Sequence, residues 1–234
     1  MTATTHFLIS CEHGSNQIPN RYRQYFCGSE SLLHSHRGYD TGALSMAKEL
    51  ALMLSAPLFA ATASRLLIDL NRSVGHPQLY SEAIRCAPAA VRREILERYY
   101  FPYRNEAEAD IAEAVSYGSR VIHISSHSFT PELNGQVRNA DIGLLYDPSR
   151  PFERDLCCRW QANLGAQLPG LTVRRNYPYA GKADSFTTYL RRRFPADTYL
   201  GIELEINQKH VLKGGRQWRA LRSFVLEAFR DAIG

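Results

Sequence analysis

The feature that most constrains the fold of this chain is an alternation between short apolar runs and segments with helical periodicity. The apolar runs have the length and composition of buried strands, and they lie at residues 6–10, 58–61, 66–70, 120–125, 142–146, 171–174 and 199–206. The helical segments lie at 41–55, 89–116 with a break near Pro102, 152–164, 185–194 and 216–233. This order predicts a three-layer α/β/α fold with a mixed, mostly parallel sheet.

Length and composition indicate one globular domain spanning residues 1–234, because 44% of the residues are hydrophobic and 22% are charged. We expect no membrane segment, since no run reaches the ~18 apolar residues that a span requires. The first ten residues lack the pattern of a signal peptide, and the five cysteines favour free thiols over a disulfide framework. These features predict a cytoplasmic protein. The sequence leaves the oligomeric state open.

The net charge of +5 comes from basic residues spread along the chain. The clusters at 92–93 and 191–193 are too short to form the basic stripe of a nucleic-acid-binding module, so we expect no nucleic-acid partner. Two interpretations remain, a solvated basic surface and a positive pocket that attracts a small anion.

Polar residues follow several of the predicted strands at the point where each strand ends. His13 follows the run at 6–10, His127 follows the run at 120–125, and Asn71-Arg72 follows the run at 66–70. Ligand sites in parallel sheets lie beyond the carboxyl ends of the strands, so we expect these groups to meet there. The two imidazoles predict a zinc site, because a catalytic zinc takes three protein ligands and an open position.

The spacing of these residues does not decide the third ligand, for which Glu12, Asn16, Asp40 and His123 compete. His123 is the weakest of the four, because it precedes His127 by about 13 Å along one strand. We expect it to be a buried polar residue with a hydrogen-bond partner.

Asn71-Arg72 is either a turn with a solvated cation or a carboxylate clamp, in which the planar guanidinium makes two hydrogen bonds. Arg65 and Arg138 are further candidates for such a role. Glu203 and Glu205 share one face of the run at 199–206, where a buried carboxylate is costly unless it is paired or near a metal. Next to zinc, one of them could act as a general base.

Motifs of several other enzyme classes are missing from the sequence. It contains no G-x-S-x-G elbow, no phosphate loop, no G-x-G-x-x-G fingerprint and no H-E-x-x-H.

Six motifs together resemble the N-formylglutamate amidohydrolase family, which is similar to the zinc carboxypeptidases and to aspartoacylase. They are CEHGSNQIP at 11–19, YDTGA at 39–43, SRLLIDLNRS at 64–73, SSHSFTP at 125–131, NYPYAG at 176–181 and GIELEINQ at 201–208. Each motif is weak alone, but their order and spacing are fairly specific. The resemblance implies a phosphorylase/hydrolase-like fold and zinc-dependent hydrolysis of a small N-acyl amino acid, such as N-formylglutamate.

The resemblance also implies the zinc ligands. His13 and His127 match two of them, but Asn16 stands where the relatives carry a ligand Glu. The relatives' Glu precedes a Thr-Gly that opens a helix, and here Asp40 precedes Thr41-Gly42. The implied third ligand is therefore Asp40, with Asn16 or Glu12 as alternatives.

The remaining roles follow from the same resemblance. Glu205 matches the general base better than Glu203, and Asn71 and Arg72 match the residues that bind the substrate carboxylate. Arg65 would stabilise the oxyanion or extend the clamp, and Arg138 would bind a second carboxylate. Tyr179 would lie in a loop that closes over the substrate. The alternative functions are a carboxypeptidase-like metallohydrolase with another substrate and a non-catalytic anion-binding protein.

Overall fold

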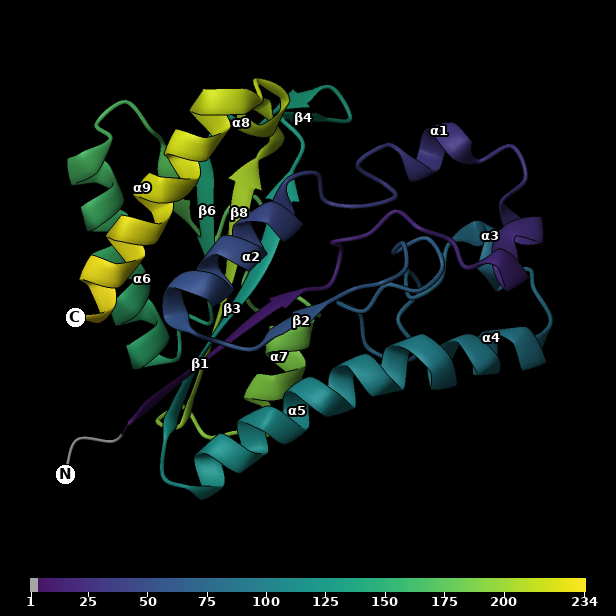
Figure 1. Cartoon of the computed structure of the whole chain (residues 1–234), viewed down its shortest axis with the longest axis horizontal. Coiled ribbons are helices and arrows are strands. Elements are labelled where there is room, and N and C mark those ends of the chain that lie inside the picture. Colours follow the sequence, from purple (N-terminus) through teal and green to yellow (C-terminus); the bar gives the residue numbers. More distant parts are fainter. Residues whose placement is uncertain (1–3) are drawn as a thin grey trace.

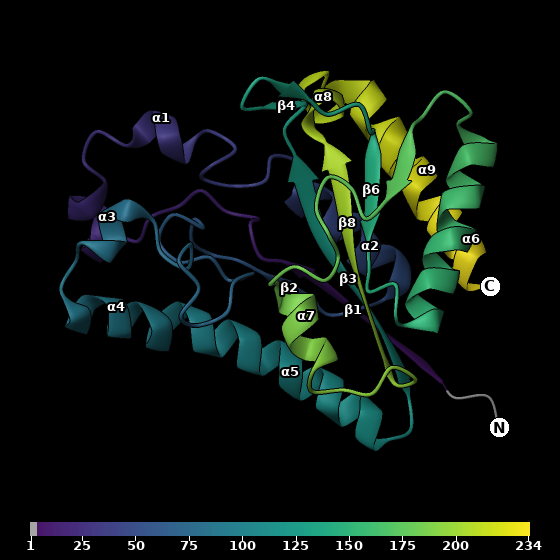
Figure 2. The same ribbon diagram turned by 180° about the vertical axis from the view of Figure 1, so that it is seen from behind.

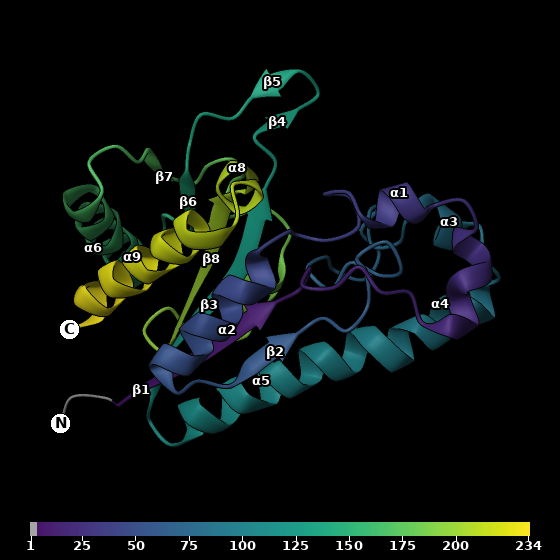
Figure 3. The same cartoon turned by 45° about the horizontal axis from the view of Figure 1, so that its top comes forward.

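A six-stranded sheet forms the centre of the protein, whose computed structural model describes residues 4–234 (Figure 1). The strands of this sheet run in the order β2-β1-β3-β8-β6-β7. The bounds of all strands are β1 (Thr5–Cys11), β2 (Leu58–Ala60), β3 (Arg120–Phe129), β4 (Glu132–Leu133), β5 (Gln136–Val137), β6 (Ile142–Leu145), β7 (Val173–Arg175) and β8 (Tyr199–Asn207). β4 and β5 form a separate hairpin, which projects from the molecule in Figure 3.

The sheet is mixed and mostly parallel, as predicted. β2, β1, β3 and β8 run parallel to one another, whereas β6 is antiparallel to β8 and β7 is parallel to β6. β1, β3 and β8 are buried along most of their length, as expected for strands covered on both faces, and polar residues of β3 and β8 such as His127 and Glu205 are buried with them. Their carboxyl ends lie at one edge of the sheet.

Helices cover both faces of the sheet, which confirms the predicted three-layer α/β architecture (Figures 1 and 2). The helices are η1 (Asn20–Phe26), α1 (Glu30–Leu33), α2 (Ala43–Leu54), α3 (Glu82–Arg85), α4 (Ala89–Ile95), η2 (Leu96–Tyr100), α5 (Phe101–Ser116), α6 (Pro151–Gln167), α7 (Phe186–Arg191), α8 (Gln208–Leu212) and α9 (Gly215–Ile233). α2, α6 and α9 pack on one face around Trp160 and Phe229, and α5 and α7 pack on the other around Phe186 and Tyr199. Within residues 4–234, no helix has both the length and the apolar character needed to cross a membrane.

A third apolar cluster lies away from the sheet, in the lobe that carries α1, α3 and α4 (Figure 1). The run at 66–70 belongs to this cluster, and the prediction that it forms a strand was wrong. Ser64 explains why this run forms turns instead of a strand. Its hydroxyl donates a hydrogen bond to the carbonyl of Gly38 and accepts one from the backbone N–H of Leu66. Consecutive turns follow, so Asn71 and Arg72 project from a turn and not from a strand end.

Several predicted boundaries also differ from the structure, and three of the differences have a local cause. β3 continues past Ser125 to Phe129, because the ladder with β8 continues through the pair His127–Glu205. α2 begins at Ala43 and not at residue 41, because Gly42 occupies its N-cap position with a φ of 87°, a conformation that favours glycine. The expected break near Pro102 is a π-helical turn, η2, so that α4, η2 and α5 run as one long rod (Figure 2).

Two glycines, one in β6 and one in α6, give a matched test of how closely β6 packs against its neighbouring segment. A Cβ on Gly143 in β6 would lie 2.0 Å from the carbonyl oxygen of Tyr177, whereas a Cβ on Gly165 in α6 would meet nothing within 4 Å. We expect Gly143→Ala to lower the free energy of unfolding by about 1–3 kcal/mol. Gly165→Ala should raise it by up to ~1 kcal/mol, because alanine favours a helix. Urea denaturation measures both, and equal effects would contradict the close approach at Gly143.

Candidate metal centre and active site

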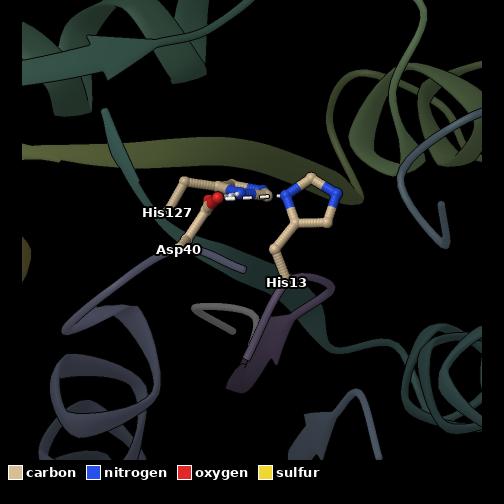
Figure 4. A group of neighbouring side chains, drawn as sticks. All are labelled: His13, Asp40 and His127. Atoms are coloured by element: carbon tan, nitrogen blue, oxygen red, sulfur yellow. Dashed lines mark hydrogen bonds and ion pairs between the residues drawn. The ribbon is translucent and has the colours of Figure 1, made fainter. Parts of the chain in front are cut away.

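Three segments bring the side chains of His13, Asp40 and His127 together (Figure 4). His13 lies in the turn that follows β1, Asp40 lies just before α2, and His127 lies in β3. The backbone N–H of Asp40 donates to the carbonyl of His13 at 2.9 Å, which ties the first two segments together. All three side chains are buried at the carboxyl edge of the sheet.

The donor atoms of these residues converge on one point. Oδ2 of Asp40 lies 2.9 Å from Nδ1 of His127 and 3.4 Å from Nδ1 of His13. One ligand atom from each residue falls within 4.8 Å of the others. Two imidazoles and a carboxylate are a ligand set typical of a catalytic zinc, so these residues could hold such an ion.

The other ring nitrogen of each histidine faces a second carboxylate. Nε2 of His13 lies 2.7 Å from Asp69, and Nε2 of His127 lies 3.1 Å from Glu12 and 2.9 Å from the hydroxyl of Ser125. Metal-ligating histidines commonly donate their second N–H to such a carboxylate, which fixes the orientation of the ring. The chemistry of this donor set therefore fits a metal ion on the Nδ1 side of both rings.

The sequence does not predict these supporting contacts of Asp69 and Glu12. Asp69 opens the DLNR motif, and Glu12 precedes His13 directly, but neither position reveals which ring it contacts. Glu12 is a candidate ligand in the sequence, and the structure places it instead on the Nε2 side of His127.

The other candidates for a third ligand lie elsewhere. The side chain of Asn16 contacts Nδ1 of His34 at 3.2 Å. His123 lies 2.7 Å from the hydroxyl of Ser10 and 2.8 Å from that of Tyr199, as expected for a polar residue within a strand. Of the candidates, only Asp40 is brought to the Nδ1 atoms of His13 and His127 in the described part of the chain.

The electrostatics of the cluster favour a bound cation. Burial alone would lower the pKa of His127, but the carboxylates of Asp40 and Glu12 raise it well above its ordinary value. Burial opposes ionisation of Asp40 as well, yet the two imidazoles hold its pKa below the usual range. The protein thus stabilises positive charge at the point where the ligand atoms meet.

A cavity of about 640 Å³ opens onto this cluster. Its lining includes Arg65, Asn71, Arg72, Tyr179, Glu203 and Glu205, together with the three clustered side chains. Arg65 donates to Asp69 at 2.8 Å and lies 3.4 Å from Oδ1 of Asp40. Burial opposes its charge, but these two carboxylates raise its pKa. Arg65 is thus fixed beside the proposed ligands while part of it remains exposed to the cavity.

Asn71 and Arg72 enter the cavity from the turn after Leu70. Oδ1 of Asn71 accepts the backbone N–H of Phe186 at 2.7 Å, and its Nδ2 lies 3.5 Å from Nε2 of His127. Nη1 of Arg72 donates to the carbonyl of Asp184. Both side chains are therefore held by the segment that leads into α7.

Arg138 and Tyr179 meet at the rim of the cavity. Arg138 donates to the hydroxyl of Tyr179 at 3.2 Å, and its guanidinium lies 5.1 Å from the centre of that ring. Tyr179 lines the cavity and is 45% exposed, whereas Arg138 is outside the lining. Arg138 thus reaches the cavity only through its contact with Tyr179, whereas Arg65 and Arg72 line the cavity directly.

Glu203 and Glu205 both face the cavity but differ in their partners. Glu203 accepts the hydroxyl of Thr187 at 2.6 Å. Oε2 of Glu205 is buried and has no hydrogen-bond partner among residues 4–234. Burial raises the pKa of Glu205 to about 8. A buried carboxylate with a free oxygen and a pKa near neutrality suits proton transfer.

A buried His–Asp–His cluster at the carboxyl edge of the sheet, beside a free carboxylate and a cavity with several arginines, is the arrangement of a hydrolase. Comparison with known proteins agrees. The N-formylglutamate amidohydrolase family matches residues 5–212, and the chain belongs to this family. The protein is therefore an amidohydrolase that acts on a small molecule.

Two solved structures cover nearly the whole chain. A gene product of Agrobacterium tumefaciens is 32% identical, has a TM-score of 0.83, and aligns over 99% of this chain and 91% of its own. An N-formylglutamate amidohydrolase from Ralstonia eutropha JMP134 has the same fold, with a TM-score of 0.70 and 18% identity over 99% of this chain and 94% of its own. No curated protein sequence shows a significant match.

The raised pKa of Glu205 predicts a pH dependence of stability in the metal-free protein. The folded chain holds this proton up to about pH 8, whereas the unfolded chain releases it near 4.5, so the carboxylate destabilises the fold as pH rises through that interval. We expect Glu205→Gln to be more stable than the wild type by about 1–4 kcal/mol at pH 9. This difference in the free energy of unfolding between variant and wild type should disappear toward pH 4. Urea denaturation with a chelator present measures it, and a gap that is constant with pH would contradict the burial effect.

Proposed function

We propose that this protein is a zinc-dependent amidohydrolase that removes the acyl group from a small N-acyl acidic amino acid, with N-formylglutamate as the leading candidate. The observation that carries the proposal is the convergence of His13, Asp40 and His127 within 4.8 Å of one another. The carboxylates of Asp69 and Glu12 on the outer ring nitrogens support it. The name of the family supports the substrate class.

Arginine side chains would bind and orient the acidic substrate. Arg72 and Asn71 would hold its α-carboxylate, because a guanidinium fork and an amide can together donate three hydrogen bonds. Arg65, fixed beside Asp40, is placed to stabilise negative charge that develops on the acyl oxygen. Arg138 would bind a second carboxylate of the substrate at the rim of the cavity, beside Tyr179.

Zinc, when bound, would supply a Lewis acid that polarises the acyl carbonyl and lowers the pKa of a water molecule. Glu205 would accept the proton of the attacking water and return it to the departing amine, since its Oε2 has no other partner in the described chain. The hydroxyl of Thr187 already donates a hydrogen bond to Oε1 of Glu203, which favours Glu205 as the general base.

Two alternatives are a carboxypeptidase-like metallohydrolase and a non-catalytic protein that binds an anion. A binding protein has no need for a buried carboxylate with a free oxygen, so Glu205 argues against that alternative. Assays of the zinc-loaded protein on N-formyl and N-acetyl amino acids and on short peptides test all three. Hydrolysis of peptide ends alone would favour the carboxypeptidase-like enzyme, and no hydrolysis would favour the binding protein.

The first test of the proposal is the metal content of the purified protein. We expect one zinc per chain in the wild type and a large loss of zinc in His13→Ala and His127→Ala, since each removes one of three ligands. Asn16→Ala is the matched control and should retain its zinc, because Asn16 contacts His34 instead. Elemental analysis after dialysis gives the result, and full zinc occupancy in both histidine variants would rule out this site.

The second test separates the two glutamates. Glu205→Gln keeps its shape but cannot accept a proton, so we expect kcat for N-formylglutamate to fall at least ~10²-fold with zinc and fold retained. Glu203→Gln should lose far less activity, since its main contact is the hydroxyl of Thr187. Steady-state kinetics on both variants gives the comparison. The reverse ranking with equal zinc content would assign the base to Glu203.

A further inference from the structure

Arg104 is a buried cation whose place in the structure is not explained by an ion pair. It lies on α5, is only 3% exposed, and has no carboxylate within salt-bridge distance in the described chain. Its Nη2 atom is buried without a hydrogen-bond partner among residues 4–234. Burying an unpaired charge is costly, so other contacts must offset the cost.

Two kinds of contact surround the Arg104 guanidinium. Three aromatic rings lie 4.3–5.0 Å from it, those of Tyr100, Phe186 and Tyr189, and their faces attract a cation. Nη1 donates to the carbonyl oxygens of Leu70 and Arg72 at 3.2 and 3.1 Å. These two carbonyls flank Asn71, so Arg104 holds the backbone on both sides of that residue.

Tyr100 acts on the same turn. Its hydroxyl donates to the carbonyl of Arg72 at 2.8 Å, so this one oxygen accepts two hydrogen bonds from the long helix. Tyr100 ends the π-helical turn η2, and single π-turns within α-helices occur frequently at functional sites. The turn at 69–72 lies outside any strand or helix, and these donors fix its position.

We infer that Arg104 is a positioning residue for substrate binding, which holds the turn that carries Asn71 and Arg72 and so sets where the substrate carboxylate is bound. The inference rests on the proposed function, in which these two side chains bind that carboxylate. The buried positive charge lies directly behind the turn, where it also favours an anion in the cavity. Arg104 itself does not line the cavity.

The test uses Arg104→Met, which keeps the length of the side chain but removes the charge and both hydrogen bonds. Arg150→Met is the matched control. Arg150 also donates to backbone carbonyls, at 3.0 Å to Tyr199 and 3.0 Å to Phe194, but at the amino end of β8. Arg104→Lys and Tyr100→Phe are milder variants that remove only some of the donors, and they provide the measurement if Arg104→Met fails to fold.

We expect the KM of Arg104→Met for N-formylglutamate to rise at least ~10-fold, with kcat within about threefold of the wild type and zinc content unchanged. KM should rise while kcat is nearly unchanged, because the contacts to the substrate carboxylate are the same in the substrate complex and in the transition state. Arg104→Lys and Tyr100→Phe should show smaller increases. Arg150→Met should lose stability but keep the wild-type KM.

An active wild type with an unchanged KM in Arg104→Met, Arg104→Lys and Tyr100→Phe would overturn the positioning role and leave the proposed function intact. A KM that rises equally in Arg150→Met would also overturn it, because the effect would then be a general loss of structure. A zinc-loaded wild type that is inactive on every N-acyl amino acid would instead overturn the proposed function.

Discussion

The convergence of His13, Asp40 and His127 on one point is the constraint on which the rest of the site depends. Two imidazoles and a carboxylate are buried together, with their ligand atoms within 4.8 Å of one another. Such burial is costly unless each charged group has a partner. The geometry satisfies that requirement on both sides of each ring. The Nδ1 atoms share Asp40, and the Nε2 atoms face Asp69 and Glu12.

These outer carboxylates connect the cluster to distant parts of the fold. Asp69 belongs to the turn that Arg104 and Tyr100 hold from the long helix, and Glu12 accepts the hydroxyl of Tyr103 from the same helix. That helix spans the lobe and one face of the sheet (Figure 1). The His13–Asp40–His127 cluster, its outer carboxylates and the turn that carries Asn71 and Arg72 are thus held by the sheet on one side and by this helix on the other.

The sequence was sufficient to predict the architecture where hydrophobic burial dominates, as in β1, β3 and β8. It failed at residues 66–70, where the hydroxyl of Ser64 stabilises turns although the run is as apolar as a strand. For the site, the expectation that His13 and His127 meet is confirmed, although His127 lies within β3 and not after it. The contacts of Glu12 and Asp69 could not be predicted, because they depend on tertiary packing. No local sequence pattern indicates which carboxylate lies beside which ring nitrogen.

The most direct test of the proposed metal centre is anomalous diffraction at the zinc absorption edge from crystals of the zinc-loaded protein. We expect one strong peak at about 2.0–2.2 Å from Nδ1 of His13, Nδ1 of His127 and a carboxylate oxygen of Asp40, with Glu205 facing it across the cavity. A peak held by Glu12 or Asn16 in place of Asp40, or no peak in this cavity, would show that these three residues do not form the metal centre.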